Sequence, residues 1–186
     1  MKFQPGRVYH VYNRGNNRER IFFKEDNYRY FLVKMRKHLL PHAEVLAWCL
    51  MPNHFHWMIR VRDEVEMGRF TQDLGTFFSS YTRAIQNQEA RTGSLFQQQY
   101  RTKELATPEY LLHCFCYVHQ NPLRAVLEVE PGQWPWSSFR DYVGLRSGQL
   151  CAQAVAAELL DLPASAAERR QLLLQILPDN AGASLV

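Results

Sequence analysis

Residues 50–61 read LMPNHFHWMIRV, and this stretch decides how the chain folds. The Pro52-Asn53 pair inside it is a turn signal. Residues 44–51, which precede the turn, form a nearly continuous apolar run of strand length, as in a strand that is covered on both faces. Residues 55–61, which follow it, also have the composition of a strand. We therefore predict a β-hairpin with its turn at Pro52-Asn53.

The second strand of this hairpin has two different faces, because successive side chains of a strand point to opposite sides. One face is purely apolar and belongs in a core packed against helices: Phe55, Trp57, Ile59 and Val61. The other face carries His54 and His56, followed by Met58 and Arg60, and we expect it to turn outward.

The two histidines are a candidate metal-binding pair. Side chains two residues apart on a strand start about 6.5–7 Å from each other, so both imidazoles can lean onto one ion with bonds of roughly 2.1 Å. The same pattern also fits a half-exposed strand that simply carries two histidines. The metal interpretation therefore needs a third partner.

The rest of the chain predicts an α+β fold. The element order is strand, helix, strand, strand, helix, strand, helix, and its first six members make the βαββαβ pattern of a ferredoxin-like sandwich with an antiparallel sheet. The elements outside the hairpin are a strand over 7–13, a helix over 26–40, a helix over 67–90, a strand over 96–105 and a helix that starts at Pro108 and ends before Asn121-Pro122.

The C-terminal part is predicted to be helical. WPWSSFRDYVG, residues 134–144, reads as a loop that leads into a short helix, and residues 151–177 read as two helices split near Pro163. We predict a catalytic domain over residues 1–145 and a helical extension over residues 146–186. The extension has three possible roles: covering the site, mediating dimerisation or capping the core.

Charge is distributed unevenly along the chain. Residues 1–103 hold 17 Lys+Arg and 9 Asp+Glu, a net charge of +8, whereas residues 104–186 hold 5 and 9, a net charge of −4. A basic part rich in Arg, Tyr, Phe and Trp suits a surface that contacts phosphates and stacks on bases. Uneven charge is also common among soluble proteins, so this feature alone leaves nucleic-acid binding open.

Other features bound the cellular setting. No apolar run approaches the length of a membrane helix, and the first residues, MKFQPGRVYH, do not resemble a secretory signal. Four cysteines without CxxC spacing favour a reducing cytoplasm. We expect no membrane partner.

The helix that contains HCFCYVHQNP offers a partner for the histidine pair. Its positions His113, Tyr117 and Asn121 are spaced by four and share one face, away from the apolar stripe of the helix. A tyrosine one turn from an amide suits nucleophilic chemistry beside a metal, which polarises the phosphate under attack. Packing or a structural hydrogen bond would also account for Tyr117.

A zinc site on this helix is a competing interpretation. It would use His113, Cys114, Cys116 and His119. Positions 114 and 116 lie about 200° apart around an intact helix, so the two thiols cannot share one tetrahedral ion. Helical geometry therefore disfavours this site.

Several segments, taken together and in order, resemble one family. They are YHVYNRGNNRERIF (9–22), MPNHFHWMI (51–59), GSLFQQQYR (93–101), YVHQNPLRAVL (117–127) and WPWSS (134–138). This series closely resembles the bacterial REP-associated tyrosine transposases, which belong to the single-tyrosine branch of the HUH nucleases. The resemblance covers about residues 5–145.

The resemblance implies roles for particular residues. His54 and His56 match the metal-binding pair of the family, Tyr117 matches its nucleophile, and Asn121 matches the polar residue that completes the metal site. The implied ion is Mg²⁺ or Mn²⁺, although two imidazoles and an amide would suit Mn²⁺ or Zn²⁺ better, so its identity stays open.

The activity implied by the resemblance is cleavage and strand transfer of single-stranded DNA at palindromic repeats that fold into hairpins. The nucleophile forms a 5′-phosphotyrosine link and releases a 3′-hydroxyl. The resemblance also implies a bacterial, nucleoid-associated protein that acts as a monomer or a homodimer.

Five basic residues are candidate DNA contacts: Arg14, Arg18, Arg20, Arg101 and Lys103. They flank the Gly15 turn or lie on the predicted strand over 96–105, where they are placed to bind phosphates or stack on bases. A plain solvated surface is an equal alternative for each. A second function stays open, a catalytically silent binder of nucleic-acid hairpins. A larger relaxase or replication initiator is disfavoured, because the chain has no room for a helicase and no second catalytic tyrosine nearby.

Overall fold

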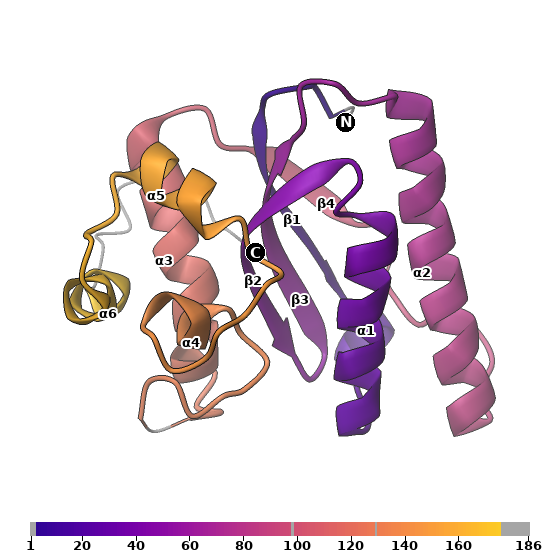
Figure 1. Cartoon of the computed structure of the whole chain (residues 1–186). Coiled ribbons are helices and arrows are strands. Elements are labelled where there is room, and N and C mark those ends of the chain that lie inside the picture. The colour runs from indigo at the N-terminus through magenta and orange to yellow at the C-terminus, as the bar shows by residue number, and fades with distance from the viewer. Residues whose placement is uncertain (1–2, 98, 129, 176–186) are drawn as a thin grey trace.

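The computed structural model describes residues 3–97, 99–128 and 130–175, which form an α+β fold around one antiparallel sheet (Figure 1). The four strands lie in the order β2-β3-β1-β4. Their bounds are Val8–Arg14 for β1, Ala43–Met51 for β2, His54–Val61 for β3 and Arg101–Glu104 for β4. With β1 and β3 in the centre, this is the strand order of a ferredoxin-like βαββαβ sandwich, and the predicted fold class is confirmed.

The hairpin of β2 and β3 forms at the predicted place. Met51 pairs with His54 at the end of the ladder, so Pro52 and Asn53 make the turn. The carbonyl oxygen of Pro52 accepts hydrogen bonds from the backbone N–H groups of Ile21 and Phe22, at 2.9 and 3.1 Å. These bonds fasten the turn to the segment that follows β1.

Helices α1 (Glu25–His38) and α2 (Met67–Glu89) cover one face of the sheet, side by side (Figure 1). The predicted apolar face of β3 points toward them. Phe31 of α1 lies at the centre of this layer, with its ring 5.3 Å from that of Phe55 and 5.7 Å from that of Trp57. Phe77 of α2 meets Phe31 edge to face at 4.8 Å. Aromatic burial on this side holds the helices to the sheet.

Helix α3 (Pro108–Arg124) covers the opposite face of the sheet, which corrects one prediction. The histidine face of β3 does not turn outward: His56 is only 2% exposed and Met58 is fully buried. The seventh predicted element is the one that covers them, because α3 packs across β2 and β3. The histidines therefore lie between two layers of the fold.

Helix α3 also runs past the predicted end before Asn121-Pro122. A proline inside a helix removes one backbone N–H but leaves its own carbonyl available. Here the carbonyls of Asn121 and Pro122 accept the N–H groups of Ala125 and Leu127, at 3.0 and 2.9 Å, and close the C-terminal end. The extra turn keeps Asn121 within the helix, on the same face as Tyr117.

Strand β4 is shorter than the predicted strand over 96–105. Regular pairing with β1 covers only residues 101–104, and an isolated bridge joins Gly15 to Phe96. The N–H of Gln97 donates to the carbonyl of Arg14 at 2.9 Å. Residue 98 lies outside the described residues. The edge of the sheet next to β1 is therefore irregular where β1 ends.

The described part of the C-terminal segment adds three short helices on the α3 side of the molecule (Figure 1). They are α4 (Phe139–Tyr142), α5 (Gln153–Leu160) and α6 (Ala166–Leu174), so the predicted pair over 151–177 is present as α5 and α6 within the described residues, with 176–177 outside them. Helices α5 and α6 both contact α3.

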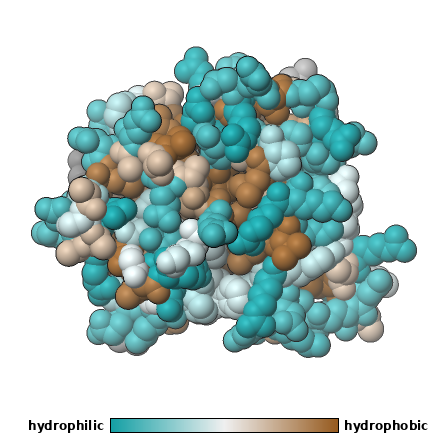
Figure 2. Space-filling view, in the orientation of Figure 1, coloured by the Kyte–Doolittle hydropathy of each residue, from teal (hydrophilic) through white to brown (hydrophobic). Residues whose placement is uncertain are grey.

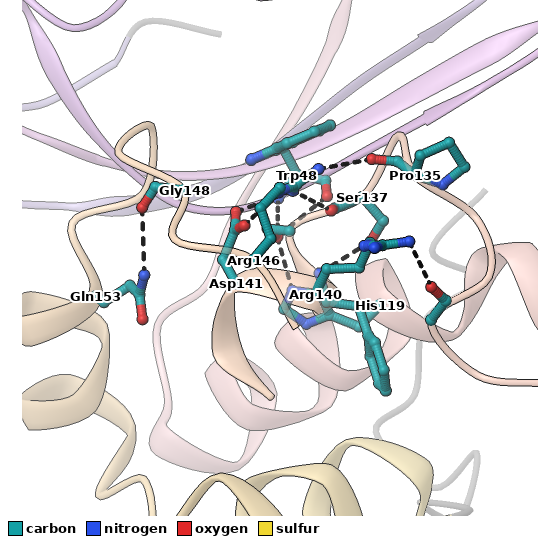
Figure 3. A network of polar contacts seen from close by, with 12 residues as sticks. Trp48, His119, Pro135, Ser137, Arg140, Asp141, Arg146, Gly148 and Gln153 are labelled. Atoms are coloured by element: carbon teal, nitrogen blue, oxygen red, sulfur yellow. Dashed lines mark hydrogen bonds and ion pairs between the residues drawn. The ribbon is translucent and has the colours of Figure 1, made fainter. Parts of the chain in front are cut away.

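Arg146, in the loop before α5, contacts α4, the loop before α4 and β2 (Figure 3). The Arg146 guanidinium binds the buried Asp141 carboxylate at 2.5 Å and the carbonyls of Pro135 and Ser137 at 2.7 Å, and lies 5.4 Å from the Trp48 ring. The partners of Arg146 come from α4, from the loop before α4 and from β2. These contacts together join the C-terminal segment to the sheet.

Apolar side chains on the surface form limited patches among hydrophilic ones (Figure 2). In the orientation of Figure 1, the brown atoms gather in the middle of the face, between α1 and the C-terminal helices. Among the described residues, no helix combines the length and apolar composition needed to cross a lipid bilayer.

Candidate metal and nucleophile site

A cavity of about 250 Å³ lies between the histidine face of the sheet and α3. Its walls come from β1, β3, α3 and the segment before β4: Tyr12, Asn13, Arg14, His54, His56, Gln97, Arg101, Tyr117 and Asn121. All four residues predicted for metal binding and catalysis line this one space. Two of the five predicted DNA contacts, Arg14 and Arg101, line it as well.

The two histidine rings are held in defined orientations by their Nδ1 atoms. Their centroids are 5.1 Å apart and their planes nearly perpendicular, at 84°. His54 Nδ1 lies 2.6 Å from the Asn53 side-chain oxygen, which only accepts, so His54 Nδ1 carries the proton and Nε2 keeps its lone pair. His56 Nδ1 lies 2.9 Å from His10 Nε2, and His56 Nε2 is buried without a partner among the described residues.

Burial keeps both rings neutral at physiological pH. Desolvation lowers the pKa of His54 to about 4, with contact to the Asn121 side chain opposing the shift and the Arg14 charge adding to it. Desolvation also lowers the pKa of His56 well below its ordinary value, with the neighbouring His10 and His54 adding to the shift. A neutral imidazole offers the lone pair that metal binding requires.

Tyr117 stands over the histidine pair. Its ring centroid is 5.4 Å from that of His56, with the planes nearly perpendicular. Burial raises the pKa of the Tyr117 hydroxyl to about 12, and the positive charge of Arg124 opposes this shift. The Arg124 guanidinium lies 5.5 Å from the centre of the Tyr117 ring. The phenol is therefore neutral at rest, beside one cation that favours its ionised form.

Asn121 lies one helical turn after Tyr117 and lines the same cavity. Its amide Nδ2 donates to the backbone carbonyl of Tyr117 at 2.8 Å. This bond uses the donor end of the amide, so Oδ1 is the atom that remains as a ligand or acceptor.

The residues at this site fit a divalent ion. The candidate donors are two imidazole nitrogens and one amide oxygen, and the buried unpartnered Nε2 of His56 is one of them. Among the described residues there is no cluster of three or more His, Cys, Asp and Glu side chains arranged to hold a metal. An ion here therefore needs Asn121, together with oxygens from water or phosphate, to complete its ligand set.

The other predicted DNA contacts lie away from the cavity wall. The Lys103 ammonium is 4.9 Å from the centre of the Tyr110 ring, a cation–π arrangement on the α3 side of β4. Arg18 and Arg20 are exposed beside the turn that follows β1. Their contact with DNA stays a prediction.

The side chains of the competing zinc interpretation have other partners. His119 is bonded through both ring nitrogens, to the Phe115 carbonyl at 2.8 Å and to the Ser138 hydroxyl at 2.7 Å. Cys116 Sγ lies 3.7 Å from the carbonyl of Leu172 in α6. These groups hold α3 to the C-terminal segment.

The tryptophans of WPWSS have structural contacts. Trp134 donates its indole N–H to the Leu50 carbonyl at 3.0 Å. The Trp136 ring stacks on that of Tyr28 at 4.7 Å. Both side chains thus hold the loop before α4 against the rest of the fold.

Sequence reasoning missed His10, Tyr12 and Gln97. His10 and Tyr12 lie on β1 opposite Met58 and His56 of β3, so they share the histidine face of the sheet. Strand alternation places His10 and Tyr12 on one face of β1, but alternation does not show which strand β1 pairs with. Gln97 had no signal at all, since it reaches the cavity through an irregular edge rather than a strand.

Comparison with solved structures finds the same fold in another protein. A structure described as "Structure of the REP associates tyrosine transposase bound to a REP hairpin" is similar over 77% of this chain and 83% of its own chain, with a TM-score of 0.63 and 16% sequence identity. At that identity the likeness establishes the fold. No curated protein matches the sequence.

Comparison with protein-family models matches residues 5–121, more than half of the chain, to the family described as "Transposase IS200 like", a family of Y1 tyrosine transposases. The match includes β1 to β4, the histidine pair, Tyr117 and Asn121. The chain belongs to the IS200-like transposase family.

Proposed function

We propose that this protein is a metal-dependent endonuclease and strand transferase that acts on single-stranded DNA. The observation that carries the proposal is the convergence of Tyr117, His54, His56 and Asn121 on one cavity of about 250 Å³. The histidine pair and the two α3 residues, which are 61 or more positions apart in the sequence, meet there within one chain. The family membership supports the reaction class, and the geometry supports the choice of these residues.

In the proposed reaction Tyr117 is the nucleophile. Its hydroxyl oxygen attacks a backbone phosphorus, the bond from phosphorus to the O3′ of the preceding nucleotide breaks, and that O3′ takes up a proton. The products are a 5′-phosphotyrosine and a free 3′-hydroxyl. Attack by a 3′-hydroxyl on the phosphotyrosine rejoins a strand and returns the phenol, so no external energy source is required.

The histidine pair and Asn121 would hold a divalent ion, Mg²⁺ or Mn²⁺, against the phosphate. Such an ion supplies charge stabilisation to the phosphoryl oxygens in the transition state. His54 presents Nε2 because Asn53 holds its Nδ1, and Asn121 presents Oδ1 because its Nδ2 is bonded to the backbone. These contacts pre-orient the ligands before the substrate arrives.

The Tyr117 phenol must lose its proton to react, and its raised pKa of about 12 opposes this step at neutral pH. The Arg124 guanidinium beside its ring favours the phenolate. A positive charge held beside a reacting oxygen stabilises the negative charge that develops on that oxygen during the reaction. We infer that Arg124 assists ionisation of the nucleophile.

We propose a folded hairpin of single-stranded DNA as the substrate. The structurally similar transposase was bound to a REP hairpin. In this chain Arg14 and Arg101 line the cavity, where they can contact the phosphates on either side of the scissile one. Acting on DNA would place the protein at the nucleoid, in the bacterial cytoplasm.

We propose that the catalytic unit spans residues 1–145 and works in cis, as a monomer, because the Tyr117 and His56 rings are 5.4 Å apart within one chain. Residues 146–186 form the proposed helical extension. The contacts of α5 and α6 with α3 support the view that it braces the helix that carries the nucleophile. Of the three roles considered from the sequence, capping the core is the one these contacts favour.

The burial of Tyr117 and its raised pKa favour one second candidate, a hairpin-binding protein without catalysis. Both candidates bind DNA, and they differ at the nucleophile.

The test is to incubate the protein with an end-labelled single-stranded hairpin and Mn²⁺, and to look for a covalent protein–DNA adduct on a denaturing gel. Tyr117→Phe should bind the hairpin but lose the adduct, by on the order of 10⁴-fold or more. Tyr30→Phe, a change at a partly exposed position on α1, is the matched control and should keep full adduct formation. An adduct that persists in Tyr117→Phe would exclude this nucleophile, and wild-type binding without any adduct would favour the silent binder.

A further inference from the structure

His10 is a buried histidine that the proposed reaction does not use. It lies in the middle of β1, is 0% exposed, and does not line the cavity. Its ring is fixed by aromatic neighbours: Tyr12 stacks on it at 4.7 Å, His56 at 5.1 Å, and Tyr117 meets it edge-on at 6.1 Å. His10 therefore touches both the candidate ligand and the candidate nucleophile.

The contact between His10 and His56 joins two ring nitrogens. His10 Nε2 and His56 Nδ1 are 2.9 Å apart, so one of them carries the proton and the other accepts it. If His10 donates, His56 must carry its own proton on Nε2, on the side where a metal would bind. If His56 donates, its Nε2 has a free lone pair. Only the second arrangement allows His56 to bind an ion.

We propose that His10 is a positioning residue that accepts a hydrogen bond from His56 Nδ1–H and so keeps His56 Nε2 available as a metal ligand. The inference rests on the proposed function, because it assumes an ion at the histidine pair. His10 touches neither substrate nor ion in this role. It acts only through His56.

The rest of the site supports this assignment. His54 has the equivalent contact, from its Nδ1 to the Asn53 side-chain oxygen, so both ligand rings would be oriented through Nδ1 and would bind through Nε2. Partners of this kind fix the tautomer and the orientation of a metal-bound imidazole. Asn53 lies in the hairpin turn, whereas His10 reaches His56 across the paired strands β1 and β3. The second contact therefore exists only once the sheet has formed.

The assignment also accounts for one of two orphaned atoms at this contact. Within the described residues, His10 Nδ1 and His56 Nε2 are both buried and have no hydrogen-bond partner. Orphaned polar atoms of this kind are costly in a folded protein, and a bound ion is one way to satisfy them. An ion on His56 Nε2 would satisfy that atom. The proton between the two rings would then lie on His56 Nδ1, and His10 Nε2 would accept it.

The test measures Mn²⁺ affinity by isothermal titration calorimetry, without DNA, on the whole chain. His10→Phe keeps a ring in the stack but removes the acceptor, and we expect Mn²⁺ to bind roughly 10- to 100-fold more weakly. His10→Gln places an amide oxygen near the position of Nε2 and should recover most of the affinity. His42→Phe is the matched control: His42 is also a buried histidine, stacked on Phe70 at 5.2 Å and bonded to Asp73, and its loss should leave Mn²⁺ affinity unchanged.

A second measurement needs no variant. The ¹⁵N chemical shifts of the histidine rings of the wild-type protein, with Mg²⁺ as a diamagnetic ion, should show His56 protonated at Nδ1 and unprotonated at Nε2. A His56 ring that keeps its proton on Nε2 with the ion bound would overturn the proposal, even if His10→Phe fails to fold.

The outcomes separate this inference from the proposed function. If the wild type forms the DNA adduct and His10→Phe binds Mn²⁺ as tightly as the wild type, His10 has no positioning role and the strand-transfer proposal stands. If the wild type binds Mn²⁺, His10→Phe binds it more weakly and His10→Gln binds it nearly as tightly as the wild type, the inference about His10 holds even where no DNA adduct forms. If the wild type does not bind Mn²⁺ at all, both the metal part of the proposed function and the role of His10 are wrong.

Discussion

On the side of β3 that faces α1 and α2, the side chains are aromatic and apolar, and Phe31 packs against Phe55 and Trp57. On the side that faces α3, the same strand presents His54 and His56, which meet Tyr117 across a cavity. The two faces differ in what burial does. Removal of apolar rings from water stabilises the first face, whereas burial of the second keeps imidazoles neutral and a phenol protonated.

This contrast indicates that alternate residues of β3 have different roles, one set in stabilising the fold and the other in the proposed chemistry. Odd-numbered residues of β3 anchor it in the aromatic layer, and even-numbered residues carry the candidate ligands. A rigid strand places ligand atoms more precisely than a loop would. Substitutions that affect one face of β3 and spare the other test whether the two faces have these different roles.

The largest expected effect is on stability, from the aromatic face. Phe31→Ala should lower the free energy of unfolding by about 3–5 kcal/mol, because it removes a fully buried ring that contacts both helices and β3. Urea unfolding followed by circular dichroism measures this change. Val33→Ala, at an exposed position of the same helix, is the control and should shift stability by less than about 0.5 kcal/mol. Equal losses in the two variants would contradict the aromatic layer as the main source of stability.

The second prediction concerns the histidine face. A ligand that binds only the folded state stabilises it, by about 2.7 kcal/mol at 100 times its Kd, so Mn²⁺ should raise the melting temperature of the wild type. His54→Gln should abolish that increase but leave the metal-free melting temperature nearly unchanged, since the His54 side chain is only partly buried. Differential scanning calorimetry with and without Mn²⁺ measures both. An unchanged Mn²⁺ effect in His54→Gln would remove His54 from the ligand set.

The third prediction is a loss of stability in acid that arises on the α3 side. Burial lowers the pKa of His10 and of His119 to about 3. Between about pH 6.5 and 3 these groups are protonated in the unfolded chain but not in the folded one. The unfolded state then binds more protons, so the free energy of unfolding should fall as the pH drops below 6.5, by up to about 1.4 kcal/mol per pH unit for each histidine.

Urea titrations at pH 7, 6 and 5 measure this slope. His119→Gln removes one of these titrating groups, and the stability of this variant should depend less steeply on pH than that of the wild type. Identical slopes in both proteins would show that His119 does not contribute.

The smallest expected effect concerns the arginines at the cavity. Arg14→Ala or Arg101→Ala should weaken binding of a single-stranded hairpin by about 1 kcal/mol, roughly fivefold in Kd. Each should also reduce the salt dependence of log K by about 0.7 per lost phosphate contact. Fluorescence anisotropy at several salt concentrations measures both quantities. Arg83→Ala, an exposed arginine on α2, is the control, and an equal loss there would mean that the arginines act only through net charge.

Local pattern was sufficient for most of the fold. The alternation of Phe55, Trp57 and Ile59 identified the core face of β3, and the turn at Pro52-Asn53 identified the hairpin, because both depend on neighbouring residues. The local sequence pattern failed to predict the ends of elements that are set by long-range contacts. The regular part of β4 is shorter than the predicted strand over 96–105. Helix α3 continues through Pro122, because the carbonyls beside the proline find backbone N–H partners further along the chain.

The candidate site divides in the same way. Two features of the site are local: the His-x-His spacing in β3 and the spacing of Tyr117 and Asn121 in α3. The sequence therefore showed both spacings, together with residue types that suit metal binding and nucleophilic attack. His10 and Gln97 were not readable, since their place depends on strand pairing and on an irregular sheet edge. Alternation along β3 predicted an outward-facing pair of histidines, whereas α3, the helix whose Tyr117 was offered as a partner for that pair, covers them.

The sequence by itself determined which side chains share a face, since the periods of strands and helices are properties of the backbone. Only the tertiary structure decided that the face of β3 with two imidazoles and the face of α3 with a phenol lie against each other around a cavity. The packing of two distant faces against each other depends on the burial of all the other side chains at once, and no short segment contains that information.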